Sequence, residues 1–197
     1  TTVVDMPNTK PVTDSLTRLE EKIKLAKSKI LVNVGFNIVP SRLEEIDAAK
    51  DRAVGYKFNL VKQWSDLVMN EETISSILRK VSTLGKAVIF HAEDGATVDE
   101  LEAKLKNEKG IEAYYEAHPT KAEEQSVQKI LRCAEGTGSR IHICHVSTLE
   151  ALSLIRDARK AGIGITCEVT PHHTLLDVES SKSRKDIAVM DPPLRDR

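Results

Sequence analysis

Residues 140–148 read RIHICHVST and bring two histidines and a cysteine into one short stretch. Isoleucine and valine alternate with the polar residues, which predicts a strand. His142 and Cys144 then share one face of that strand, and His145 lies on the other face beside its end. Taken alone, the stretch is more typical of a core histidine with satisfied hydrogen bonds and a small apolar cysteine than of a metal site.

Residues at the ends of the other predicted strands change this balance. The polar side chains at strand ends are Asn8 in DMPNT, Lys57 in GYKF, His91 in IFHAED, Cys144 and His145 in ICHVS, and Glu168 in CEVTPHH. In a parallel α/β fold the carboxyl ends of the strands meet at one rim. Singly, Lys57 could be a solvated strand terminus, His91 a helix cap and Glu168 a surface carboxylate. All these ordinary interpretations would have to hold together at one rim, so a metal site is favoured.

The residue types suit such a site. Neutral imidazoles bind zinc, and a bound ion lowers the pKa of water to about 7, so that hydroxide is available at neutral pH. A lysine cannot bind a metal as an ammonium, but burial beside cations favours its free amine. The amine of Lys57 could then take up carbon dioxide and become a carbamate, which bridges two metal ions as a carboxylate would.

The elements that must position these residues alternate along the chain. Strands are predicted over residues 3–5, 30–39, 55–61, 86–91, 140–145 and 164–169, and helices over 15–29, 42–52, 71–84, 98–108, 121–135 and 149–160. Ser41 is expected to cap the second helix, with Glu44 placed for a capping box. Strands separated by helices predict a parallel sheet with right-handed crossovers. Because no Gly-rich phosphate loop of the GxGxxG or GxxxxGK[ST] type occurs, part of a (β/α)8 barrel is favoured over a doubly wound nucleotide-binding sheet.

Composition narrows the functional classes. The chain has 197 residues and a net charge of −1, which argues against nucleic-acid and membrane partners. Its three cysteines are far apart and form no CxxC, so a reducing compartment and a cytoplasmic localisation are expected. No apolar run reaches transmembrane length. No repeat or linker-like segment occurs, and a single domain over residues 1–197 is expected.

Six motifs, taken in order, resemble the cyclic amidohydrolases of the metal-dependent amidohydrolase superfamily, and dihydroorotases in particular. They are DMPNTKP, GYKF, FHAED, HICHVST, CEVTPHH and DPPLR. HICHVST followed by CEVTPHH is the most specific part, and the resemblance extends over essentially the whole chain. It implies an α/β fold, an incomplete (β/α)8 TIM-type barrel whose strands correspond to strands 2–7 of the family barrel.

The resemblance also implies a metal centre. Lys57 would be the bridging lysine, N-carboxylated as in relatives that do not use aspartate there. His91 and His145 would bind the second, more buried zinc, so that one or two Zn²⁺ ions are the expected cofactor. Cys144 and Glu168 stand where some relatives have an additional metal nearby.

Two residues are implied in binding the substrate. Asn8 would help to hold the carboxylate of dihydroorotate. Asp191, in DPPLR, stands where the family usually has an asparagine that helps to bind the pyrimidine ring. An aspartate there has no hydrogen to donate and adds negative charge near a dianionic product. Three further histidines, His142, His172 and His173, are interpreted as core residues or as residues around the metal site that do not bind the ion.

The expected reaction is reversible hydrolysis of dihydroorotate to N-carbamoyl-aspartate, a step of pyrimidine biosynthesis. The family's His-x-His pair and its arginine, from the first barrel strand, and the catalytic aspartate of the eighth strand have no counterpart in these 197 residues. No catalytic general base is therefore assigned within the chain. By itself the chain is expected to retain at most part of the second zinc site and little or no activity.

Two alternatives remain open. One is another cyclic amidohydrolase, such as an allantoinase or a hydantoin-cleaving enzyme, since only dihydroorotase needs the ring carboxylate. The other is a non-catalytic dihydroorotase-like scaffold that docks on aspartate transcarbamoylase. The missing ligands and Asp191 favour the scaffold, whereas the retained Lys57, His91 and His145 argue against it. Open sheet edges and the habits of the family also predict a homo-oligomer.

Overall fold

A computed structural model of the chain describes residues 1–62, 64–108, 110–181 and 189–196. The strands are β1 (Thr2–Asp5), β2 (Asn33–Ile38), β3 (Gly55–Asn59), β4 (Ala87–His91), β5 (Arg140–Ile143) and β6 (Ile165–Cys167). The helices are α1 (Leu16–Lys27), α2 (Glu44–Ala48), α3 (Glu71–Ser82), α4 (Gly95–Leu105), α5 (Ile111–Ala117), α6 (Thr120–Ala134), α7 (Leu149–Lys160), α8 (Pro171–Leu175) and α9 (Val178–Ser181).

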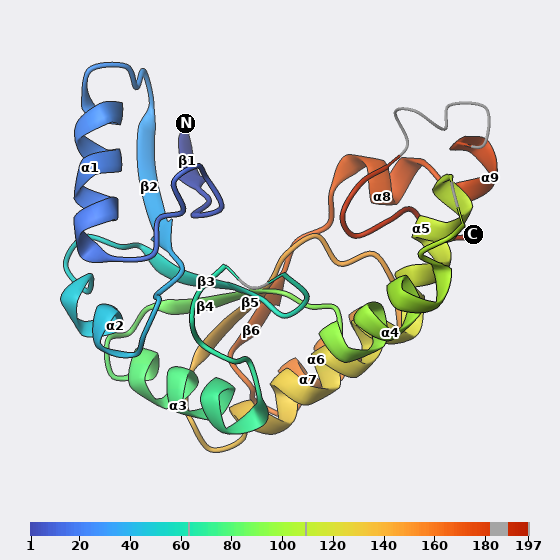
Figure 1. The fold of residues 1–197 in the computed structure, drawn as a ribbon. Helices are drawn as coiled ribbons and strands as arrows, with labels where there is room; N and C mark the ends of the chain where they lie inside the picture. The colour runs from blue at the N-terminus through green and yellow to red at the C-terminus, as the bar shows by residue number, and fades with distance from the viewer. Residues whose placement is uncertain (63, 109, 182–188, 197) are drawn as a thin grey trace.

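The six strands form one parallel sheet in which each strand pairs with the next one along the chain. A doubly wound sheet reverses its strand order part-way across, whereas a barrel adds its strands in sequence. The sheet curls, and α3, α6 and α7 cover its outer side (Figure 1). The described residues therefore form a curled half-barrel, which confirms the predicted incomplete (β/α)8 architecture.

The two faces of the sheet differ in chemistry because side chains alternate along each strand. The positions between the core residues, such as Asn37, Lys57 and His142, face the concave side. Period-two alternation in the sequence thus supplies a helix-packing face and a polar inner face from the same strands. The core residues on the strands, which pack against the helices, are Phe36, Ile38, Tyr56, Phe58, Val88, Phe90, Ile141, Ile143 and Ile165.

Helix caps fix the crossovers close to the rim. Asp94 precedes α4, and its carboxylate accepts a hydrogen bond from the backbone N–H of Thr97 at 3.0 Å. The same carboxylate forms an ion pair with Lys129 at 2.6 Å. Thr148 caps α7 in the same way, five positions after the end of β5. Such caps satisfy backbone donors at a helix start. No helix in the described part of the chain is both long and apolar enough to cross a membrane.

The second crossover differs from the sequence prediction. Helix α2 begins at Glu44, and Leu43 precedes it without a side-chain cap. The expected capping by Ser41 is therefore wrong. The neighbouring Glu45 instead accepts a hydrogen bond from the backbone N–H of Leu16 at 2.9 Å, so the acidic side chain supports the start of α1. The backbone N–H of Ser41 donates to the carbonyl oxygen of Asp14 at 2.9 Å, so a tertiary contact has replaced the expected local one.

Candidate metal centre at the rim of the half-barrel

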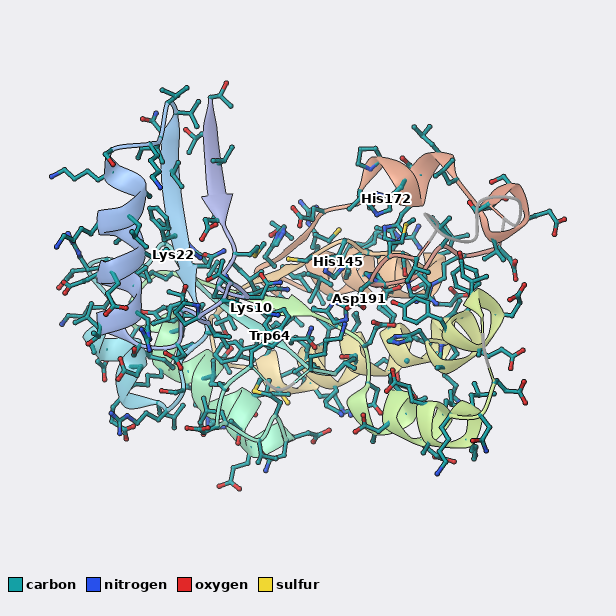
Figure 2. All side chains as sticks on the ribbon, turned by 45° about the horizontal axis from the view of Figure 1, so that its top comes forward. Lys10, Lys22, Trp64, His145, His172 and Asp191 are labelled. Carbon is teal, nitrogen blue, oxygen red and sulfur yellow. The ribbon has the colours of Figure 1, made fainter. Side chains whose placement is uncertain are left out.

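A cavity of about 270 Å³ opens at the carboxyl ends of the central strands. Trp64, His145 and Asp191 lie in the middle of the molecule, between the β1–β2 pair and α8 (Figure 2). All the residues predicted from the sequence except Glu168 meet in this cavity. Its lining consists of Met6, Asn8, Lys57, Asn59, Trp64, His91, Cys144, His145 and Asp191.

Lys57 lies at the bottom of the cavity, on the concave face of β3, and is only 3% exposed. Its Nζ has no hydrogen-bond partner among the described residues other than a weak interaction with the thiol of Cys144. Burial lowers the pKa of Lys57 below its usual value, against the opposing effect of Cys144. This shift increases the fraction of the free amine, which is the form that can react with carbon dioxide.

His91 and His145 face each other across the same cavity. His91 ends β4, and His145 follows the adjacent β5, where Phe90 is paired with Ile143. The Nδ1 atom of His91 lies 3.2 Å from the Nε2 atom of His145. Two nitrogens that bind one tetrahedral zinc at 2.0–2.1 Å are about 3.3 Å apart. The two rings are thus already spaced as ligands of a single ion.

The orientation of His145 depends on an unusual backbone conformation. Its φ of 36° lies in the left-handed region, and it is the one non-glycine residue with positive φ in the described ranges. Such conformations cost free energy and cluster at functional sites. Burial, followed by the charges of His91 and Lys57, lowers the pKa of His145 to about 3. The ring is therefore neutral at physiological pH, as metal binding requires.

Glu93 is a site residue that the sequence interpretation missed. It is 1% exposed, and its carboxylate accepts hydrogen bonds from His91 Nε2 at 2.8 Å and from His118 Nδ1 at 3.1 Å. Burial alone would raise the pKa of Glu93, but these hydrogen bonds hold it far below its usual value. Burial would likewise lower the pKa of His118, and the bond to Glu93 raises it instead. The signal in the sequence was a carboxylate two positions after the strand-ending histidine of FHAED.

A second cluster of potential ligands lies beside the first. Ligand atoms of His142, Cys144 and Glu168 all fall within 4.8 Å of one another. The structure therefore brings together the predicted pair Cys144 and Glu168, and it adds His142, which the sequence interpretation had left without a role. This cluster is more open, because the side chains of His142 and Glu168 are 26% and 53% exposed. Burial raises the pKa of the Cys144 thiol, which favours its protonated form.

Asp191 enters the cavity from the segment that carries DPPLR. Its carboxylate forms an ion pair with Lys62 at 2.6 Å and lies 3.6 Å from His91 Nε2. His173 supports this segment, because its Nε2 lies 3.0 Å from the carbonyl oxygen of Pro192. His173 thus holds a loop in place and does not line the cavity, whereas Asn8 does.

The chain resembles curated dihydroorotases over nearly its whole length. No protein-family model matches the chain. A curated dihydroorotase of Methanosarcina acetivorans is 34% identical over 204 residues, which cover 98% of this chain and 44% of that protein. A dihydroorotase of Listeria welshimeri is 32% identical over 209 residues, which cover 100% of this chain and 46% of that protein. The chain thus spans a little under half the length of these curated relatives.

Solved structures place the fold in the same group. The L-hydantoinase (dihydropyrimidinase) from Arthrobacter aurescens matches with a TM-score of 0.92 and 25% identity, over 100% of this chain and 45% of that one. This chain is related to the cyclic amidohydrolases. The dihydropyrimidinase from Brevibacillus agri shares the fold, with a TM-score of 0.87 and 22% identity over 100% of this chain and 45% of its own. The half-barrel of this cyclic amidohydrolase relative therefore matches a little under half of each of these larger TIM-barrel proteins.

Proposed function

We propose that this chain supplies the central part of a zinc-dependent dihydroorotase site, which hydrolyses dihydroorotate reversibly to N-carbamoyl-aspartate in pyrimidine biosynthesis. The observation that carries the proposal is the His91–His145 pair, set at 3.2 Å in a cavity that also contains the buried amine of Lys57. The curated relatives named dihydroorotase support the choice of substrate.

The donor set fits one or two zinc ions. Two neutral imidazole nitrogens at this separation suit a tetrahedral ion. The amine of Lys57 is buried and lacks a strong partner in the described part of the chain, so it is available for further chemistry. Its reaction with carbon dioxide would release one proton and leave a carbamate, whose two oxygens could bind two ions. His91, His145 and carboxylated Lys57 would then hold the metal.

The residues around the metal site would bind and orient the substrate. A zinc ion held there would polarise the ring carbonyl and make hydroxide available at neutral pH. The side-chain amide of Asn8 would donate to the carboxylate of dihydroorotate, and the carboxylate of Asp191 would accept from a ring N–H. Neither a His-x-His pair nor an assigned general base occurs in the sequence, so these residues alone should give little or no turnover.

Hydrolysis of an uncharged cyclic amide of the hydantoin type is the second candidate. Asp191 favours it, because a carboxylate in the cavity repels an anionic ring substituent and Lys62 compensates its charge only in part. The match to the L-hydantoinase from Arthrobacter aurescens also supports it. A scaffold without catalysis, docking on aspartate transcarbamoylase, is the third alternative.

Zinc content and substrate preference separate these candidates. We expect metal-depleted protein to take up Zn²⁺ tightly, and His91→Ala to abolish that uptake, as measured by equilibrium dialysis with elemental analysis. A panel of dihydroorotate, hydantoin, dihydrouracil and allantoin then identifies the ring that the full protein opens. Preference for hydantoin would replace dihydroorotase with the second candidate. Absence of zinc uptake would favour the scaffold.

Other features support the cellular setting and the organisation that we propose. The three cysteines are unpaired, which favours a reducing compartment such as the cytoplasm. One hydrophobic core extends from Leu19 to Ile165, which favours a single partial barrel domain over residues 1–197. The outer backbone groups of β1 and β6 lack a neighbouring strand within the described residues, which favours homo-oligomeric assembly at these edges.

A further inference from the structure

A buried polar network contacts His91 at the ring nitrogen that does not face His145. Glu93 occupies its centre. One carboxylate oxygen accepts from His91 Nε2 at 2.8 Å, and the other accepts from His118 Nδ1 at 3.1 Å. The guanidinium Nη2 of Arg195 lies 3.8 Å from that second oxygen. Glu93 and His118 are both almost fully buried, so these contacts are shielded from solvent.

The contact with Glu93 determines which nitrogen of His91 carries the proton. An ionised carboxylate can only accept hydrogen bonds. The proton of a neutral His91 must therefore lie on Nε2, and the lone pair lies on Nδ1, which faces His145 at 3.2 Å. The opposite tautomer would put two lone pairs against each other at 2.8 Å and leave Nδ1 unable to bind a metal.

Arg195 extends the same network to the loop that carries His145. Its Nε donates to the hydroxyl oxygen of Ser147 at 3.0 Å, and its Nη1 donates to the carbonyl oxygen of His118. Ser147 also donates from its backbone N–H to Glu123 at 2.9 Å and from its hydroxyl at 2.8 Å. Arg195 and Glu123 thus both hold Ser147, which lies only two positions after the left-handed backbone of His145.

We propose that Glu93 is the positioning residue of the metal centre, and that Glu93 and Arg195 together set the spacing of the two imidazoles. The inference rests on the proposed function, since it assigns a task to a network behind proposed ligands. Carboxylates that accept from the second nitrogen of a metal-bound histidine fix its orientation, and their loss weakens metal affinity 10- to 100-fold as a rule. Glu93 would not touch the substrate.

The test is a titration of Co²⁺, whose visible absorption reports ligand geometry, into the metal-depleted full protein. Glu93→Gln keeps the size of the side chain but removes its charge and offers His91 a donor as readily as an acceptor. We expect affinity for Co²⁺ to fall about 10- to 100-fold, with a change in the position or intensity of the absorption bands of the bound ion. If the role of Glu93 were purely structural, neither the position nor the intensity of these bands would change.

Asp94→Asn is the matched control. Asp94 is the next residue after Glu93. It caps α4 and forms an ion pair with Lys129 at 2.6 Å, but within the described residues it forms no hydrogen bond or ion pair with His91 or His145. Its substitution should lower the melting temperature while leaving affinity for Co²⁺ and its spectrum unchanged. Equal weakening by Asp94→Asn and Glu93→Gln would overturn the inference, because general loosening would then explain both.

The outcomes for the inference and for the proposed function differ. If the unsubstituted protein binds no Co²⁺, the proposed metal site fails and the inference fails with it. If it binds Co²⁺ and Glu93→Gln binds equally well, the inference alone fails. Should Glu93→Gln not fold, nitrogen NMR of the imidazoles in the metal-free unsubstituted protein gives the answer. The inference requires His91 protonated on Nε2, and protonation on Nδ1 would overturn it.

Discussion

Lys57 and Phe58 are neighbours in the sequence, and both are almost completely buried, at 3% and 1% exposure. Phe58 points to the helices and packs against Phe90, with ring centroids 6.1 Å apart. Lys57 points to the concave side, where its amine lacks a strong partner in the described part of the chain. Burial of Phe58 stabilises the fold, whereas burial of Lys57 destabilises it.

The difference shows how β3 divides its tasks. The helix-facing side of the strand supplies the free energy that keeps the sheet folded, since buried aromatic side chains contribute several kcal/mol each. On the concave side, burial of the amine lowers the unfolding free energy. Such a loss of stability is expected at positions whose side chains serve a function. Four experiments can break or sharpen this comparison.

The largest effect is expected from Phe58→Ala. Removal of the ring leaves a cavity between β3, β4 and the covering helices, which should lower the free energy of unfolding by about 3–5 kcal/mol. Urea denaturation followed by circular dichroism measures the change. Phe58→Leu, which keeps most of the volume, should cost clearly less. A cost below about 1 kcal/mol for the alanine variant would show that the helix-facing side is not the main source of stability.

Lys57→Met should act in the opposite direction. It keeps the length of the side chain but removes the buried polar group, so the metal-free protein should gain about 1–3 kcal/mol in unfolding free energy. Zinc uptake should decrease in the same variant. Lys104→Met, on an exposed face of α4, serves as the control and should change stability by less than about 0.5 kcal/mol. Destabilisation by Lys57→Met would mean that the amine has a stabilising partner.

The dependence of stability on pH gives a third test. Burial places the pKa of Lys57 in the folded protein below its usual value. Between these two pKa values the unfolded chain binds a proton that the folded chain does not, so the unfolding free energy rises with pH in that interval. In chelator-treated protein, the stability gap between Lys57→Met and the unsubstituted chain should therefore narrow as pH rises towards 10.5, the usual pKa of lysine. A gap that stays constant from pH 7 to pH 10 would contradict the shift.

The smallest effect is expected from Glu168→Gln. Its side chain is half exposed and its contacts lie in the second cluster, so stability should change by no more than about 0.5 kcal/mol. The first equivalent of Co²⁺ should bind with unchanged affinity and spectrum, because Glu168 does not line the cavity of His91 and His145. Loss of that first equivalent would mean that the two clusters form one site.

Much of this arrangement could be predicted because it depends on local patterns. Alternation along the strands and the position of Lys57, His91 and His145 at strand ends follow from the sequence, and the structure brings all three into one cavity. The contact of Glu93 with His118 could not be predicted, since His118 lies 25 positions away and only the fold brings it close. The cap at Ser41 failed for the same reason, because the backbone N–H of Ser41 donates to the carbonyl oxygen of the distant Asp14 at 2.9 Å.

The left-handed backbone at His145 also restricts how this position can change by mutation. Besides glycine, asparagine, aspartate and histidine are the residues that tolerate φ near 36° most readily. Histidine codons become asparagine or aspartate codons by substitution of their first base alone. A single base substitution can therefore replace His145 by a residue that keeps the left-handed turn but lacks the imidazole. A descendant of this chain could lose its metal while its fold remained intact, with Asn or Asp at position 145 as the genetic trace of that loss.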